Sequence, residues 1–147
     1  MPEQNPAGEV TSQDAYRALQ NIANVVRRTP LVRSLWLSDH VSASVYLKIE
    51  TLQNTGSFKI RGVANKLSSL SKEERKHGVI TVSSGNHGQA VSHVSSQLGI
   101  PAVVCLSEKT PQNKIESVEA FGAETVVQGR DYKQAESSAG RCKRSGF

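Results

Sequence analysis

The first half of the chain alternates between helical and extended patterns of apolar residues. Residues 1–11 are mostly polar and contain two prolines and a glycine, so we predict a disordered lead-in there. Apolar side chains then recur at helical spacing, which predicts a helix from a cap at Ser12 to about Arg28. Residues 44–50 alternate between apolar and polar side chains, as in a strand with one buried face.

A second long helix is predicted after Thr55-Gly56-Ser57, and its first turn carries Lys59. A helix N-terminus bears partial positive charge, so an ammonium group is disfavoured at this place. Lys59 is therefore electrostatically unusual. The apolar stripe that this helix is predicted to bury consists of Ile60, Val63, Ala64, Leu67 and Leu70.

From Gly78 onward, strand and helix patterns follow one another regularly. Strands are predicted near residues 79–83, 102–106 and 124–128, and helices lie between them near residues 87–98 and 111–121. Strands joined by such helices pair in parallel through right-handed crossovers. The pattern predicts an α/β fold, a three-layer αβα arrangement with a parallel sheet, in which ligands bind at the carboxyl ends of the strands.

Composition agrees with this fold class and narrows the partners. Only 5% of the residues are aromatic, so the core must be aliphatic, which suits a parallel sheet covered by helices. The formal net charge of +5 would suit nucleic acid, but basic residues mostly alternate with acidic ones, as over residues 72–76. We therefore predict no nucleic-acid partner.

Cysteine spacing and hydropathy predict neither a metal site nor a membrane segment. Cys105 and Cys142 lack the spacing of zinc ligands, and Cys105 is predicted to be a small core residue. The N-terminus has no apolar signal core, and no apolar run approaches the roughly 18 residues of a membrane span. The prediction is a cytoplasmic protein without a membrane partner.

The stretch SSGNHGQA, residues 83–90, lies between a predicted strand and a predicted helix. Its glycines permit a sharp turn that leaves the amides of Gly85, Asn86, His87 and Gly88 free at a helix N-terminus, which predicts an anion site. The stretch is neither a Walker loop nor a G-x-G-x-x-G motif. A phosphate or a carboxylate would fit, and the alternative is a tight turn without a ligand.

TGSFKIRGVANKL and VSSGNHGQAVSHVSSQLGIPAVV, about two dozen residues apart, resemble the threonine/serine dehydratase and serine racemase branch of the fold-type II pyridoxal-phosphate enzymes. The resemblance begins at RRTPLVRS (27–34) and extends to PQNKIESVEAFGAETVVQG (111–129). It implies a tryptophan-synthase-β-like fold, pyridoxal 5'-phosphate as cofactor, and a homo-oligomer in the full-length family. The implied reaction converts L-threonine, L-serine or a similar hydroxy amino acid into a 2-oxo acid and ammonia.

The resemblance also implies roles for the residues of the two stretches. Lys59 is the catalytic lysine that carries the cofactor, with a pKa lowered by the helix N-terminus and by partial burial against Phe58. Phe58 packs beside the cofactor ring, and Asn86 binds the 3-hydroxyl group of the cofactor. The substrate carboxylate binds the loop of Ser83, Ser84, Gly85, Asn86 and His87.

The residues leave open which activity and substrate within this branch the chain has. In racemases of this branch, a serine at the position of Ser84 acts as the second catalytic proton donor, whereas many dehydratases have alanine there. The stretches IETLQNTG and VCLSEKTPQNK also resemble a dehydratase-like subgroup of ectoine utilisation. Asn54 replaces a lysine near the nucleotide site of mammalian-type serine racemase, so activation by ATP is not predicted.

The resemblance divides the chain into parts and predicts an incomplete enzyme. Residues 12–70 correspond to the N-terminal part of the large domain, residues 71–136 to the small α/β domain, and residues 137–147 to an atypical basic tail. The family's glycine-rich phosphate loop, the group at the pyridine nitrogen and the acidic cation ligands are expected beyond this stretch. We therefore expect exposed apolar edges in the first part, and a non-catalytic remnant or interaction module is the alternative to an enzyme.

Overall fold

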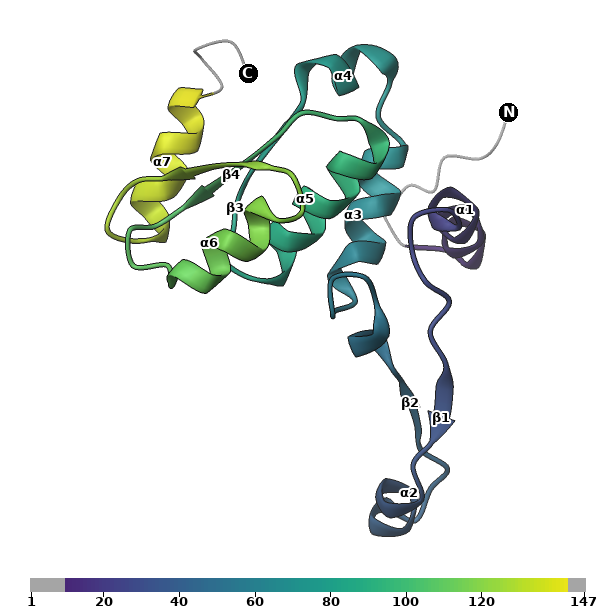
Figure 1. The fold of residues 1–147 in the computed structure, drawn as a ribbon. Coiled ribbons are helices and arrows are strands. Elements are labelled where there is room, and N and C mark those ends of the chain that lie inside the picture. Colours follow the sequence, from purple (N-terminus) through teal and green to yellow (C-terminus); the bar gives the residue numbers. More distant parts are fainter. Residues whose placement is uncertain (1–9, 143–147) are drawn as a thin grey trace.

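The computed structural model describes residues 10–142, which form a body with two sheets and several helices (Figure 1). The predicted lead-in lies outside the described residues, apart from residues 10 and 11. The elements in chain order are α1 (Ser12–Ile22), β1 (Leu31–Arg33), α2 (Leu35–Val41), β2 (Tyr46–Lys48), the 3-10 helix η1 (Glu50–Leu52), α3 (Lys59–Ser68), α4 (Lys72–His77), β3 (Val79–Val82), α5 (Asn86–Leu98), β4 (Ala102–Leu106), α6 (Gln112–Glu119), β5 (Glu124–Val127) and α7 (Tyr132–Cys142).

The parallel sheet has the strand order β3-β4-β5 and is covered on both faces, as the sequence predicts (Figure 1). Successive side chains of a strand point to opposite faces. Val104 and Leu106 accordingly pack with Val118 of α6, whereas Val103 and Cys105 pack with α7. The three-layer αβα arrangement and the buried position of Cys105 are confirmed.

Helix α3 packs against α5 and α1 and shares one core with them. Ile60 and Ala64 are fully buried on α3, and Val94 is fully buried on α5. The predicted stripe of α3 is confirmed, with Leu70 partly buried at its end. The predicted division near residue 70 stays a prediction, and α3 and α5 contribute to one apolar cluster across it.

Helix α1 begins and ends earlier than the sequence predicts. The cap is Thr11 and not Ser12, because the Thr11 hydroxyl accepts from the Asp14 N–H and the Asp14 carboxylate accepts from the Thr11 N–H at 2.9 Å. The helix stops at Ile22, where the next turn inserts Val25 into the core. Tertiary contacts thus override the helical spacing that continues to Arg28 in the sequence.

Strands β1 and β2 form an antiparallel pair that, together with α2, projects away from the body, and we call residues 31–48 the arm (Figure 1). The strand β2 is shorter than the predicted 44–50, and it has no buried face. The expectation of exposed apolar edges is confirmed. The exposed large apolar side chains of the arm are Leu31, Val32, Leu35, Trp36, Val41, Tyr46 and Leu47.

The last described helix, α7, continues to Cys142. Ala135 and Ala139 are its buried residues, so the helical packing extends into the segment that was predicted to be an atypical tail. Residues 143–147 lie outside the described residues. Within the described range, no helix has the length and apolar character needed to cross a membrane.

Candidate active site

The loop after β3 presents the open N-terminus of α5. The Ser83 N–H still donates to the Cys105 carbonyl at 3.3 Å, and the Gly85 N–H approaches the Ser83 hydroxyl at 3.4 Å. Gly85 precedes the helix and supplies no side-chain cap. Within residues 10–142, the N–H groups of Asn86, His87 and Gly88 have no partner. This geometry suits an anion, because the free amides and the helix dipole both favour negative charge.

Gly88 allows the first turn of α5 to lie directly against the end of β3. A Cβ atom at this position would lie 2.3 Å from the Ser83 carbonyl oxygen and 3.2 Å from Cγ1 of Val104. The position therefore requires glycine for close packing. This contact fixes where the open amides lie relative to the sheet.

Lys59 is the first residue of α3, so its predicted place in the first helical turn is confirmed. Its Nζ atom lies 5.0 Å from the centroid of the Phe58 ring. The expected partial burial is wrong, because Lys59 is exposed and Phe58 is 61% exposed. Phe58 precedes the helix and lines the same cavity as Lys59, but it is largely exposed and leaves the amine open to solvent.

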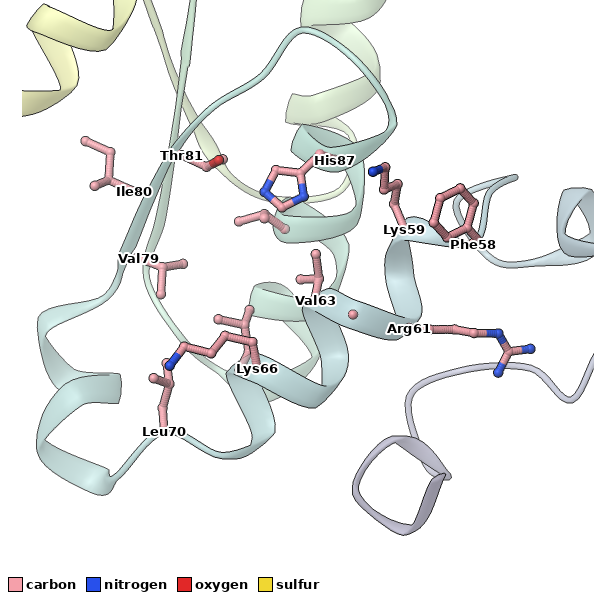
Figure 2. Close-up of a pocket in the computed structure, with 13 residues that line it drawn as sticks. Phe58, Lys59, Arg61, Val63, Lys66, Leu70, Val79, Ile80, Thr81 and His87 are labelled. Carbon is pink, nitrogen blue, oxygen red and sulfur yellow. The ribbon is translucent and has the colours of Figure 1, made fainter. Parts of the chain in front are cut away.

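Lys59 and His87 meet at one cavity, although they lie on different helices and 28 positions apart in the sequence. The cavity has a volume of about 560 Å³ and lies between α3, the start of α5 and β3. Figure 2 shows the amino group of Lys59 turned toward the imidazole of His87, with Lys66 near the other end of α3. The fold therefore places the amine beside the open N-terminus of α5.

The other residues of the predicted loop do not line this cavity. Ser83 and Ser84 line a smaller hollow of about 50 Å³, together with Tyr132 of α7. Asn86 is exposed at the start of α5. The structure thus brings Lys59, Phe58 and His87 together around one cavity and places the two serines toward α7.

Sequence reasoning missed a network that holds the segment before Lys59. Arg61 donates to both carboxylate oxygens of Glu50, each at 2.8 Å, and Thr29 donates to the same carboxylate at 2.5 Å. Gln53 is 4% exposed and exchanges hydrogen bonds with the backbone of Arg27 at 3.0 and 2.8 Å. We call these five residues the Glu50 network. It ties the root of the arm to α3 within one turn of Lys59.

Two buried hydroxyl groups in the same segment have no partner among the described residues. They belong to Thr55 and Ser57, which are 7% and 8% exposed. Unpartnered buried polar groups are costly and call for an explanation. Thr55 and Ser57 lie just before Lys59 in the chain but do not line the cavity that Lys59 and His87 share. The donors available at the site are the amine of Lys59 and the amides at the start of α5.

The Glu50 network predicts a dependence of stability on acid. The hydrogen bonds from Arg61, and next those from Thr29, lower the pKa of Glu50 from 4.5 to about 2. A lowered pKa contributes stability above pH 4.5, and this contribution is lost as the pH falls toward 2. We expect this shift to contribute about 2 kcal/mol to the free energy of unfolding. The contribution is smaller than the full pKa shift would give, because water reaches the side chains of Glu50 and Arg61, which are 16% and 27% exposed.

The measurement compares Glu50→Gln with the unchanged chain by urea unfolding at a series of pH values, followed by circular dichroism. The variant should be less stable near pH 7, and the difference should vanish toward pH 2. Glu73→Gln is the control, because its ion pair with Lys76 has side chains 73% and 72% exposed. A pH-independent difference for Glu50→Gln would contradict the prediction.

A parallel αβα sheet whose first strand ends at an open helix N-terminus, beside a lysine amine, defines an α/β protein with a candidate anion-binding site. A sequence profile described as "Pyridoxal-phosphate dependent enzyme" matches residues 22–146. The chain belongs to this family. Its α/β fold and its solved neighbours are those of the fold-type II pyridoxal-phosphate enzymes.

Individual relatives agree with the family assignment. An L-threonine ammonia-lyase from Thermotoga maritima is 42% identical over 130 residues, which are 88% of this chain and 32% of the relative. A catabolic L-threonine dehydratase from Staphylococcus aureus is 37% identical over 126 residues, covering 85% of this chain and 36% of the relative. A serine racemase from Dictyostelium discoideum superimposes with a TM-score of 0.87 at 33% identity, covering 93% of this chain and 45% of that structure. The chain thus spans about a third of the length of these curated relatives.

Proposed function

We propose that this chain is the lysine-bearing part of a pyridoxal-phosphate dependent ammonia-lyase acting on L-threonine, L-serine or a similar hydroxy amino acid. The products would be a 2-oxo acid and ammonia. The observation that carries the proposal is the shared cavity of Lys59 and His87 at the open N-terminus of α5. The names of the relatives support the substrate class.

Pyridoxal phosphate, when bound, supplies an aldehyde and an electron sink that makes the α-proton of an amino acid removable. Lys59 would hold this group covalently through Nζ, and Nζ would later take and hold the α-proton of the substrate. Its exposure at the cavity leaves the amine accessible for both tasks. Phe58, adjacent to Lys59, would pack beside the ring.

The start of α5 would bind and orient the substrate. The free N–H groups of Asn86, His87 and Gly88 would bind its carboxylate, with Ser83 and Gly85 shaping the loop. The Asn86 side chain would orient the cofactor through its 3-hydroxyl group. The close packing at Gly88 would keep these amides in place during the reaction.

The cellular location, assembly and substrate of the whole protein are part of the same proposal. A cytoplasmic location and a homo-oligomeric assembly would suit an enzyme of amino-acid metabolism. The substrate partner would be a free amino acid, since the cavity of about 560 Å³ has the size of a small-molecule site.

Racemisation is the second candidate function, with Ser84 as a second proton donor. The observation that favours it is the position of Ser84, which lines the hollow on the α7 side while Lys59 lines the cavity on the α3 side. The solved structure of serine racemase that superimposes at a TM-score of 0.87 also supports it. A D-amino acid among the products would identify this activity, and a 2-oxo acid would identify elimination.

The test mixes the purified chain with pyridoxal phosphate, reduces the mixture with borohydride and locates the modified lysine by peptide mass spectrometry. The expected result is modification of Lys59, with an absorbance band that disappears in Lys59→Ala. Lys66→Ala is the matched control, because Lys66 lies on the same helix, is exposed and lines the same cavity. Modification of Lys66 in preference to Lys59, or of neither lysine, would overturn the proposal.

A further inference from the structure

The first turn of α3 is held against the body on two sides. Ile60 is fully buried in the apolar cluster that α3 shares with α1 and α5. Arg61, the next residue, donates from Nε to one carboxylate oxygen of Glu50 and from Nη2 to the other, each at 2.8 Å. Such a paired contact of a guanidinium with a carboxylate is strong and directional. The apolar contact therefore holds the helix in place, and the ion pair resists its rotation about the helix axis.

Lys59 lies on the other flank of the same turn. Successive residues of an α-helix are about 100° apart around the axis, so Lys59 and Arg61 project to opposite sides of Ile60. Figure 2 shows the guanidinium of Arg61 directed away from the Lys59 amino group, which points toward His87. The ion pair of Arg61 thus acts on Lys59 through the helix backbone. A rotation that separated Arg61 from its carboxylate partner would also shift Lys59 relative to α5.

Gln53 holds the segment that leads into Lys59. Its side chain is buried, and both polar atoms of its amide are used: Oε1 accepts from the Arg27 N–H at 3.0 Å, and Nε2 donates to the Arg27 carbonyl at 2.8 Å. Gly56 then turns the chain with a φ of 65°, which favours glycine. The Gly56 N–H donates to the Gln53 carbonyl at 2.9 Å. The turn before α3 is therefore anchored at its beginning.

The two anchors meet on the same stretch of backbone, residues 27–29. Nη2 of Arg61 approaches the Arg27 carbonyl and the Thr29 hydroxyl, each at 3.3 Å. The Arg27 carbonyl is also the acceptor for Gln53. The stretch from Gln53 to Arg61, which carries Lys59, is thus fixed at both ends on one support. Lys59 itself is exposed, so its own side-chain packing does not provide this restraint.

We propose that Arg61 and Gln53 are positioning residues of the candidate site, which hold Lys59 in place beside the open N-terminus of α5. The role of Lys59 toward a ligand rests on the proposed function, whereas the restraint on its backbone does not. A misplacement of about 1 Å can slow a reaction that depends on orientation about a hundredfold. Lysine at position 61 would keep the charge but not the paired contact, because an ammonium group lacks the planar fork of donors.

The first test measures the order of the backbone without any ligand. NMR relaxation at the amides of residues 56–59 compares the unchanged chain with Arg61→Lys. We expect order parameters near 0.85, as in rigid backbone, in the unchanged chain and a fall toward about 0.6 in the variant. Equal order parameters in the two chains would overturn the proposal.

Arg75→Lys is the matched control for this measurement. Arg75 holds the other end of α3, where it donates to the carbonyls of Leu70 and Ser68 at 3.1 and 2.8 Å. Its replacement removes a similar set of hydrogen bonds but leaves the support of Lys59 intact. The order parameters of residues 56–59 should therefore not change. An equal fall in Arg75→Lys and Arg61→Lys would show general loosening of the helix and would refute local positioning.

The second test measures which lysine reacts with pyridoxal phosphate. After reduction with borohydride, peptide mass spectrometry gives the ratio of modified Lys59 to modified Lys66 in each variant. Lys66 is exposed on the same helix and lines the same cavity, so this ratio is an internal reference that a change in overall stability does not move. We expect it to fall about tenfold in Arg61→Lys and in Gln53→Ala, and to stay unchanged in the Arg75→Lys control.

The outcomes of the two tests separate this proposal from the proposed function. Preference for Lys59 in the unchanged chain, with the same ratio in Arg61→Lys and Gln53→Ala, would overturn the positioning role alone. If the unchanged chain showed no preference for Lys59, the proposed function would fail. The order parameters of residues 56–59 would then still decide whether Arg61 holds the backbone of Lys59.

Discussion

Replacing Gly88 with alanine is expected to lower the free energy of unfolding by about 3 kcal/mol, near the upper end of the usual cost of overpacking. The added Cβ would lie 2.3 Å from the carbonyl oxygen of Ser83, which is backbone and cannot rotate away. Either α5 or the end of β3 must shift. The open amides at the start of α5 would shift with it. Pyridoxal phosphate should therefore also react more slowly with Lys59 in this variant than in the unchanged chain.

The measurement is urea unfolding followed by circular dichroism, with Gly62→Ala as the matched control. Gly62 lies in the interior of α3, and a Cβ there would have no heavy atom within 4 Å. Alanine is favoured over glycine by about 1 kcal/mol in a helix interior, so this variant should be more stable than the unchanged chain. If Gly88→Ala also proved neutral or stabilising, the close contact with Ser83 would not exist.

Ile60→Ala is the second large change, with an expected loss of about 3 kcal/mol from removing a fully buried side chain. Ile60 is 0% exposed and lies in the cluster that joins α1, α3 and α5. Because these helices share that core, their unfolding transitions should move together. Ile60→Val should cost about 1 kcal/mol at the same site.

Leu19→Ala is the control for this series, since Leu19 is 57% exposed on α1 and should change stability little. Hydrogen exchange at amides of α3 and α5 gives the separate readouts. Destabilisation of α3 with unchanged protection in α5 would contradict the shared core. That outcome would instead favour two units that unfold independently near the predicted division at residue 70.

The sequence predicts the parallel sheet well, because its strands and helices bury one another and therefore carry clear periodic patterns of apolar residues. The three strands agree with the predictions to within about two residues, and their alternate faces match the packing of Val104 and Cys105. The end of α1 could not be predicted in the same way. It depends on contacts of Val25 and Arg27 with distant residues, which helical periodicity does not contain.

Some features of the candidate site can likewise be predicted from local sequence, whereas others depend on tertiary packing. The place of Lys59 at a helix start and the open amides after Gly85 follow from local sequence. The meeting of Lys59 with His87 depends on how α3 packs on α5. No sequence pattern predicts the ion pair of Glu50 with Arg61. Charged residues eleven positions apart are ordinarily both solvated at the surface and do not contact each other.

The arm described above also decides what an optical experiment on this protein can detect. The chain has one tryptophan, Trp36, which lies on α2 in the arm and is 73% exposed. It stacks on His40 with the two ring centroids 5.6 Å apart. Neither residue belongs to the apolar cluster that joins α1, α3 and α5. A two-stranded ribbon is marginally stable by itself. Tryptophan fluorescence therefore reports on the arm, and unfolding of the core must be followed by other signals.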